Sequence, residues 1–479
     1  MPIQLSGRAD FTLEHFFRAA WGGEGVRFGQ AALSRMAESR AQFLDLIDND
    51  PEITVYGVTS GYGQFARLRY TAAERKAQAR RPPHGPYVAF GPPLPERVAR
   101  GIVFARLTNF VEGHSAISPE LASAIARMLE EGPLPRVSIA GQGGAGEITG
   151  LAPLFNAVAE RFALGEKEML ALINGSPCAT ALVADTALAG RRRLALTEEV
   201  FALSSEALKV PLAHFGADLE DLWGDPAEAA TLARLRKLIA GGDPERRPYQ
   251  APVSFRILPR VLAQYRRAVE AAETAAATSL RAITDNPVFL PAKNGEKPKV
   301  FSTGGYHNAM AHPAMDNVAA AMADLALLAD RHTSKLLDGK YSLLPDQLQK
   351  GEGYLGCLGM AQVGYAEQAR RAAQRNFLPG SEGGGFGQND VAPPTFFAWR
   401  AQEEAGRCLE AGLAMVAVVA SQAFFVTGRQ APPALARLLT TVRSHVAPLT
   451  ESRVLADELA GLAAALRTQV YDVAPRLVE

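Results

Sequence analysis

The chain has 479 residues, and 50 Lys and Arg are balanced by 50 Asp and Glu. A chain without net charge has no global attraction for nucleic acid or for an anionic membrane, so neither is an expected partner. Its length allows about three domains or one long helical bundle, with a sizeable core in either case.

The three cysteines are far apart and odd in number: Cys178, Cys357 and Cys408. They fit neither a disulfide framework nor a zinc site, and we expect buried, reduced thiols. The first residues lack a basic stretch followed by an apolar core. This pattern favours a cytoplasmic protein over a secreted one.

The first part of the chain is expected to be mainly helical. Apolar spacing predicts a helix over Asp10–Asn49, followed by a β-branched run that breaks into a glycine-rich loop at Ile53–Gly63. The segment Arg67–Arg97 is rich in Arg, Pro and Gly, which predicts a long loop, either a connector or an active-site lid. Helical spacing returns over Pro95–Glu131.

A second glycine-rich stretch, Ser138–Gly150, lies at the centre of the N-terminal part. Leu151–Glu199 then predicts two helices, which Asn174–Pro177 divides by a turn signal. Short strands are expected at Val288–Leu290 and Val300–Ser302 around a turn rich in Lys and Gly.

Long helices rich in Ala, Leu and Met follow Asn308. One segment, Ala411–Phe425, is almost free of polar groups, yet it is shorter than a membrane span. A helix buried on all sides of a bundle explains it better. We therefore expect an N-terminal domain over 1–200, which contains both glycine-rich segments, and a long-helix bundle over 201–479.

Six short motifs occur in order along the chain. They are Tyr56-Gly-Val-Thr-Ser-Gly-Tyr-Gly63, Gly150-Leu-Ala-Pro-Leu154, Leu170-Ala-Leu-Ile-Asn-Gly175, Ser254-Phe-Arg256, Asp285-Asn-Pro287 and Gln388-Asn-Asp390. Together they resemble the aromatic amino acid ammonia-lyase and aminomutase family, which includes histidine and phenylalanine ammonia-lyases. The resemblance implies a mainly α-helical fold with a central bundle of long helices. It also implies a homotetramer whose active sites are shared between subunits.

The resemblance further implies roles for individual side chains. Tyr56 matches the catalytic tyrosine, which acts as a base. Arg256 matches the arginine that holds the substrate carboxylate, a task suited to its bidentate fork. Asn174 and Gln250 fall on polar positions near the amine and the carboxylate. On residue type alone, a packing tyrosine, a surface arginine, a turn-forming Asn and an exposed Gln are the alternatives.

The chain departs from the family pattern at the position of the prosthetic group. Family members cyclise an Ala-Ser-Gly tripeptide to the electrophile methylidene-imidazolone. Ungapped alignment on Leu-Ala-Pro-Leu places Glu147, Ile148 and Thr149 there. No Ser or Cys is present, and a slip of one residue offers only Thr149 as the central residue. Gly150 replaces the usual Asp. The chain is therefore expected to work without this or any other cofactor.

Without the electrophile, the substrate has to carry its own good leaving group. A trimethylammonium group meets this need, and the chain in this respect resembles ergothionase-type relatives, which release trimethylamine from ergothioneine. The rings of Tyr56, Tyr62 and Tyr306 are candidates to contact such a cation, with core packing as the alternative for Tyr62 and Tyr306.

Two further positions bear on the substrate ring. Arg106 lies near the ring-selecting position, where it either holds an anionic group or turns outward. Asn389 replaces the Glu of histidine lyases and the Gln of phenylalanine lyases.

These observations predict a carbon-nitrogen lyase that acts on an amino acid or betaine, most simply an elimination of trimethylamine from a substrate such as ergothioneine. Another elimination or an isomerisation on the same scaffold is one alternative. A catalytically inactive, ligand-binding homologue is the other. The spacing of His307 and His312 does not predict a metal site.

Overall fold

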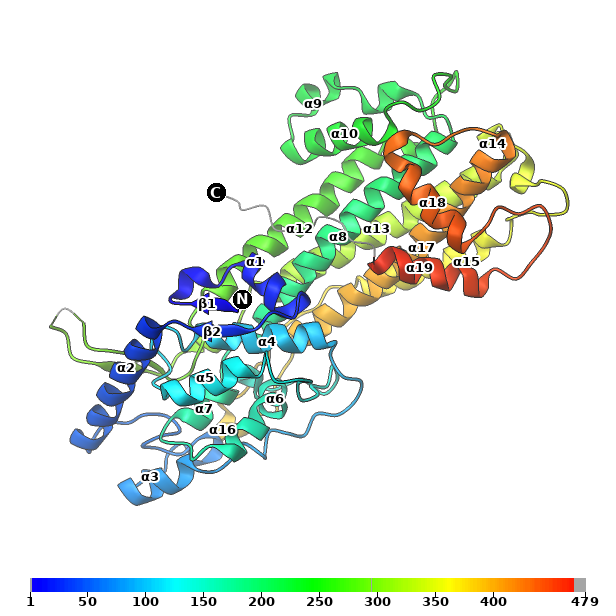
Figure 1. The fold of residues 1–479 in the computed structure, drawn as a ribbon. Helices are drawn as coiled ribbons and strands as arrows, with labels where there is room; N and C mark the ends of the chain where they lie inside the picture. The colour runs from blue at the N-terminus through cyan, green and yellow to red at the C-terminus, as the bar shows by residue number, and fades with distance from the viewer. Residues whose placement is uncertain (1, 294, 469–479) are drawn as a thin grey trace.

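The computed structural model describes residues 2–293 and 295–468, and Figure 1 shows an elongated, mainly helical molecule. Its centre is a bundle of long helices, in which α13 and α17 pack closely along their length and α8 and α12 lie beside them. The members are α8 (Pro177–Ala207), α12 (Leu258–Leu280), α13 (Ala311–Leu337), α15 (Leu358–Ala372) and α17 (Thr395–Thr427). The predicted fold class, mainly α with a central bundle of long helices, is confirmed.

Helix α17 contains the apolar segment Ala411–Phe425 and runs for 33 residues. It is the one helix of the described residues that is long and apolar enough to cross a membrane, and 83% of its most apolar window is buried inside the protein. The helix ends at Gly428, which has a left-handed backbone (φ 67°). Burial among the other bundle helices accounts for its composition, as the sequence predicts.

The N-terminal lobe consists of shorter helices beside two parallel strands, β1 (Ile3–Leu5) and β2 (Val26–Phe28). Its helices are α1 (Leu13–Phe16), α2 (Gln30–Asn49), α3 (Ala72–Ala79), α4 (Glu96–Thr108), α5 (Pro119–Arg127), α6 (Ile148–Arg161) and α7 (Glu168–Ile173). The expected single helix over Asp10–Asn49 is wrong, because Gly22 and Gly23 end the first helical stretch and β2 intervenes. The segment Arg67–Arg97 is likewise not all loop, since it contains α3.

The end of the bundle away from this lobe is covered by short helices (Figure 1). They are α9 (Asp218–Trp223), α10 (Pro226–Ile239), α14 (Gly339–Ser342), α18 (Ala436–His445) and α19 (Ala456–Thr468). The one-turn helix α11 (Val253–Arg256) directly precedes α12. A second one-turn helix, α16 (Gly384–Gly387), lies in the N-terminal lobe.

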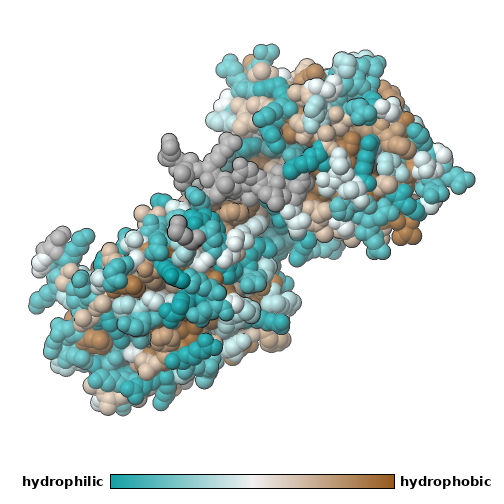
Figure 2. Space-filling view, in the orientation of Figure 1, coloured by the Kyte–Doolittle hydropathy of each residue, from teal (hydrophilic) through white to brown (hydrophobic). Residues whose placement is uncertain are grey.

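The expected boundary at residue 200 does not exist in the structure, because α8 runs through it from the N-terminal lobe into the bundle. Later residues also return to the first lobe. Strands β3 (Val288–Leu290) and β4 (Lys299–Phe301) form an antiparallel pair there, and the Phe289 N–H donates to the His114 carbonyl at 2.9 Å. Figure 2 shows the resulting shape, two broad lobes joined by a narrower waist.

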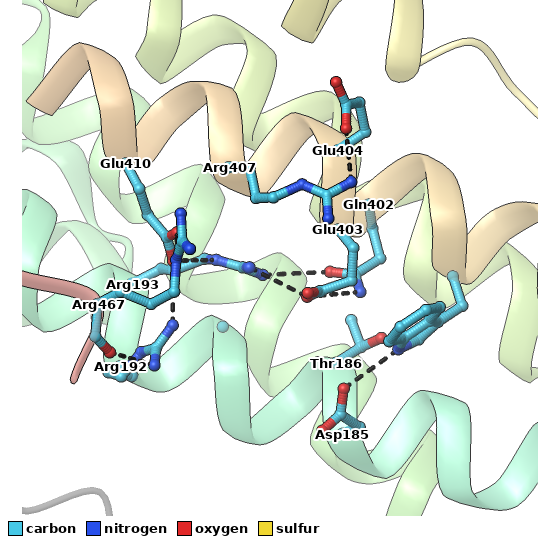
Figure 3. Close-up of polar contacts among 12 residues, drawn as sticks. Asp185, Thr186, Arg192, Arg193, Gln402, Glu403, Glu404, Arg407, Glu410 and Arg467 are labelled. Atoms are coloured by element: carbon cyan, nitrogen blue, oxygen red, sulfur yellow. Dashed lines mark hydrogen bonds and ion pairs between the residues drawn. The ribbon is translucent and has the colours of Figure 1, made fainter. Parts of the chain in front are cut away.

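A buried ionic cluster joins α8 to α17 inside the bundle (Figure 3). Arg193 lies between Glu403, 3.0 Å away, and Glu410, 2.9 Å away. Glu410 also pairs with Arg192 at 3.0 Å and with Arg467 of α19 at 2.6 Å. Each buried charge in this cluster therefore has an opposite partner, and the cluster fixes the contact between three helices.

Candidate active site

Glu147 lies where the family would build its electrophile, and its carboxyl group is fully engaged by α8. Its Oε2 accepts from the Cys178 N–H at 2.7 Å, and its Oε1 accepts from the Ala179 N–H at 2.8 Å. These N–H groups belong to the first turn of α8, where helix donors lack partners of their own. Glu147 has a left-handed backbone (φ 59°), and its two side-chain bonds hold this unfavourable conformation.

The electrostatics of Glu147 are set mainly by its burial, since only 4% of the residue is exposed. Burial raises the pKa of Glu147 to about 8, against the lowering effect of the two N–H donors. The same surroundings raise the pKa of the Cys178 thiol, because it is buried and lies close to Glu147.

The next two residues, Ile148 and Thr149, begin α6, and Thr149 borders a pocket. Its hydroxyl donates to Gln142 Oε1 at 2.8 Å. The pocket is small and lies between this segment and the first turn of α17. Thr395 lines it with a buried hydroxyl that has no hydrogen-bond partner. No Ser or Cys is placed to form the methylidene-imidazolone, so these residues do not fit that group.

Tyr56 lies in the glycine-rich loop, half-buried, and its hydroxyl accepts from the Gly63 N–H at 3.1 Å. The loop packs against α7, because a side chain at Gly57 would collide with Leu170. The short helix Gly63–Phe65 in turn lies against α16. These contacts place Tyr56 beside the segment that carries Asn389.

Asn389 is hydrogen-bonded to a carboxylate of its own loop, since its Nδ2 donates to Glu382 Oε1 at 3.0 Å. Ser381 connects this loop to the second glycine-rich stretch, since its hydroxyl donates to the Gly143 carbonyl at 3.4 Å. The pKa of Glu382 is lowered by its hydrogen bonds, although burial opposes this. A carboxylate is thus present next to Asn389, where the sequence indicated only a neutral amide.

Asn174 precedes α8 and lies beside Gly146, with a buried Oδ1 that has no hydrogen-bond partner. Its carbonyl accepts from Arg106 Nη1 at 2.6 Å. Arg106 is completely buried and faces Asp285 at 3.4 Å, and Lys167 pairs with the same carboxylate at 2.7 Å. Arg106 therefore does not turn outward, and in this chain its charge faces the Asp285 carboxylate. Its partner Asp285 comes from the Asp-Asn-Pro motif.

Tyr306 and Gln250 occupy different parts of the molecule. The short helix Gly304–Tyr306 packs against the short helix Ala145–Glu147, so Tyr306 lies close to Glu147. Gln250 is exposed and precedes α11, far from this cluster along the bundle.

Arg256 also lies at the far end of the bundle from Tyr56. It directly precedes α12, whereas Asp285 and the cluster around Glu147 follow the other end of that helix. A helix of 23 residues spans about 34 Å at 1.5 Å per residue. One chain therefore brings together Tyr56, Glu147, Asn174, Tyr306 and Asn389, but it does not bring Arg256 and Gln250 to them.

The sequence did not indicate three members of this region: Lys167, Glu382 and Thr395. Lys167 has no motif around it, and only the fold places it against Asp285. Glu382 reaches Asn389 because a turn with a left-handed Gly383 lies between them. Thr395 follows two prolines, which signal a helix start but not a pocket.

The cysteines and histidines have no shared arrangement. Cys178 and Cys408 are buried as expected, whereas Cys357 is exposed, which corrects the expectation for this thiol. In the part of the chain that the structure describes, no group of three or more His, Cys, Asp or Glu is placed to hold a metal ion.

The long-helix bundle, the glycine-rich loop of Tyr56 and the start of α6 define a helical lyase scaffold. Residues 11–444 match the family described as aromatic amino acid lyase, and the chain belongs to that family of carbon-nitrogen lyases. It is 27% identical to a histidine ammonia-lyase of Paracidovorax citrulli, over 96% of this chain and 95% of the relative.

Solved structures share the fold over almost the whole chain. Tyrosine aminomutase from Streptomyces globisporus superposes with a TM-score of 0.85 and 24% identity, covering 98% of this chain and 97% of the other. Ergothionase from Treponema denticola superposes with a TM-score of 0.87 and 18% identity, covering 98% and 99%. At these identities the likeness establishes the fold.

Proposed function

We propose that the protein eliminates trimethylamine from a histidine-betaine-like substrate such as ergothioneine, without methylidene-imidazolone, to give an arylacrylate. The observation that carries the proposal is the chemistry of Glu147, Ile148 and Thr149. The segment has no Ser or Cys side chain to lose, and both oxygens of Glu147 are bound to α8. A substrate with its own leaving group needs no electrophile.

The reaction balances without a cofactor. The phenolate form of Tyr56 takes a proton from the β-carbon and becomes a neutral phenol, and the electron pair of that C–H bond forms the Cα–Cβ double bond. The Cα–N bond breaks at the same time, and its electron pair leaves with neutral trimethylamine. Ammonia expelled from a free amino acid would instead require help that this segment does not offer.

The substrate carboxylate binds Arg256, in a site that subunits share. Because Arg256 lies about 34 Å from the Tyr56 cluster along α12, the complete site needs Arg256 of the partner subunit. A homotetramer of this kind is the assembly we propose. The carboxylate of Glu382, held by Asn389, favours a ring that carries an N–H donor, such as an imidazole or thioimidazole.

The test is to incubate the purified protein with ergothioneine, hercynine, histidine, phenylalanine and tyrosine. We expect growth of the acrylate absorbance together with trimethylamine from the betaines, and no ammonia from the free amino acids. Tyr56→Phe should abolish turnover, whereas Tyr70→Phe, in the same region but outside the cluster, should not. Intact mass should match the unmodified chain.

Three outcomes would contradict the proposal. Ammonia release from a free amino acid would overturn the leaving-group reasoning, and a mass lower by two waters would show that the segment cyclises. Conversion of an amino acid to its β-isomer would favour an aminomutase. Binding without turnover of any betaine, unchanged in Tyr56→Phe, would favour an inactive homologue.

A further inference from the structure

A buried histidine on α13 contacts the two residues that directly precede Arg256. His332 is completely buried, and its Nε2 lies 3.2 Å from the Ser254 carbonyl oxygen. Its ring stacks on Phe255 with a centroid distance of 3.6 Å and an angle of 12° between the planes. Ser254 and Phe255 are the first two residues of the Ser-Phe-Arg motif, so both contacts act on the backbone that carries the arginine.

The two ring nitrogens of His332 have different partners. A carbonyl oxygen can only accept, so Nε2 carries the proton and donates to Ser254. Nδ1 is then an acceptor and lies 2.8 Å from the hydroxyl oxygen of Ser204 on α8, whose proton the Phe201 carbonyl at 3.0 Å also faces. Burial lowers the pKa of His332 to about 3, which keeps the ring neutral in this arrangement.

The helix that carries Arg256 has little structure of its own. Helix α11 has four residues, and its N-cap, Pro252, has no side-chain hydrogen bond. One turn is too short to be stable by itself, so its position depends on tertiary contacts. Arg256 does not anchor itself through its Nε, which is buried without a hydrogen-bond partner. A further contact, from the Ala251 N–H to His214 Nε2 at 3.3 Å, lies before the helix.

We infer that His332 is a positioning residue for Arg256: through Ser254 and Phe255 it links α11 to α13 and, through Ser204, to α8. The inference rests on the proposed role of Arg256 as the carboxylate clamp. It accounts for an aromatic residue directly before the arginine, whereas the contact to Ser254 uses only its backbone. The Ser254 carbonyl receives the imidazole N–H, and the Phe255 ring supplies the surface on which the imidazole stacks.

The test measures how strongly the protein prefers a carboxylate over an uncharged amide. Affinities for urocanate and for its primary amide are determined by calorimetry. The ratio of the two affinities measures how much the contact between Arg256 and the carboxylate contributes to binding. A bidentate, charge-assisted contact predicts a preference of about 10- to 100-fold in the wild type. Arg256→Gln should reduce the ratio to near unity.

The variant His332→Phe keeps the stack on Phe255 but removes the donor to Ser254. Its acid-to-amide ratio should fall at least about fivefold, although Arg256 is still present. His332→Gln retains an N–H donor and should recover part of the ratio. The matched control is Tyr265→Phe, which removes a buried hydroxyl that donates to the Gly190 carbonyl at 3.3 Å on another part of the bundle. This control should leave the ratio unchanged.

A wild-type ratio in His332→Phe, with a ratio near unity in Arg256→Gln, would overturn the inference. If His332→Phe does not fold, Ser204→Ala replaces it, because this variant removes the hydroxyl beside Nδ1. An unchanged ratio there would also overturn the inference. Turnover of ergothioneine by the wild type is measured separately. If the wild type turns over ergothioneine and His332→Phe keeps the wild-type acid-to-amide ratio, only the inference about His332 fails. If His332→Phe has a lowered ratio but the wild type does not turn over ergothioneine, only the proposed function fails.

Discussion

At the scale of single residues, Glu147 shows how one substitution changes both structure and chemistry. Its side chain caps α8, with bonds of 2.7 and 2.8 Å to two N–H groups. These bonds satisfy donors at the helix start. Under the proposed function, the same residue stands at a position where no electrophile forms.

The raised pKa of Glu147 predicts a pH-dependent stability. The pKa of Glu147 rises from 4.5 to about 8 on folding. Its stabilising contribution to the free energy of unfolding is therefore complete below pH 4.5 and is lost as the pH rises towards 8. The wild type should therefore lose stability relative to Glu147→Gln over this window, on the order of 1–3 kcal/mol. Thermal unfolding of both proteins at pH 5 and pH 8.5 measures the difference. Parallel pH profiles would contradict the expectation.

Arg256 gives a second prediction at this scale. Lysine keeps the charge but lacks the planar fork, so Arg256→Lys should raise KM for ergothioneine about 10-fold with a smaller change in kcat. Arg260→Lys is a suitable control, because Arg260 lies four residues along the chain, stacked on Trp223 at 4.4 Å. Steady-state kinetics of the wild type and both variants measure this change in KM. Equal KM values for Arg256→Lys and Arg260→Lys would show that Arg256 does not bind the carboxylate.

At the scale of elements, the bundle depends on charges as well as on apolar contacts. The side chains of Arg193 and Glu410 are 2% and 1% exposed, and they join α8 to α17 near the middle of both helices. The pKa of Glu403 is lowered to about 2 by Arg193 and Arg97, against the effect of burial. The usual pKa of a glutamate is 4.5, so the stabilising contribution of Glu403 to the free energy of unfolding is present above pH 4.5. This contribution is lost as the pH falls towards 2.

Removal of the Arg193 charge should therefore strongly destabilise the fold. Arg193→Met leaves Glu403 and Glu410 buried with fewer partners, which should destabilise the protein by about 3–5 kcal/mol. The control is Arg407→Met on α17 (Figure 3), whose side chain is 56% exposed and pairs with Glu404. Arg407→Met should lower the free energy of unfolding by less than about 0.5 kcal/mol. Chemical denaturation measures both, and similar losses would contradict a special role for the cluster.

At the scale of the whole molecule, the length of the bundle separates the proposed base from the proposed clamp. Tyr56 and Arg256 lie near opposite ends of α12, a helix of 23 residues. No bending of loops closes a gap of about 34 Å. With the proposed roles of Tyr56 and Arg256, this separation makes association of chains a condition of activity.

Mixed assemblies test this condition. Tyr56→Phe and Arg256→Gln should each be inactive alone, because each lacks one half of every site. Co-expressed at equal amounts, they should recover about a quarter of wild-type activity, since a site then combines an intact Tyr56 from one chain with an intact Arg256 from another. Absence of any recovery, with mixed assemblies confirmed by native mass spectrometry, would place both residues in the same chain.

The sequence alone determined the features that depend on local pattern. The six motifs indicated the family, and the apolar run Ala411–Phe425 indicated a buried helix. The missing serine is the basis of the proposal that the electrophile is absent. Each is a property of neighbouring residues, because helical spacing, turn signals and side-chain chemistry need no distant partner. The break at Gly22 and Gly23 was missed, since apolar spacing continues across it.

Only the tertiary structure decided what these residues touch. Glu147 meets Cys178 across 31 positions, and His332 meets Ser254 across 78. Arg106 was expected near substrate, yet packing places it against Asp285 in the core. Such contacts depend on how helices far apart in the chain pack, and one residue's type does not reveal its partner. The motif thus located the arginine, and packing determined what holds it.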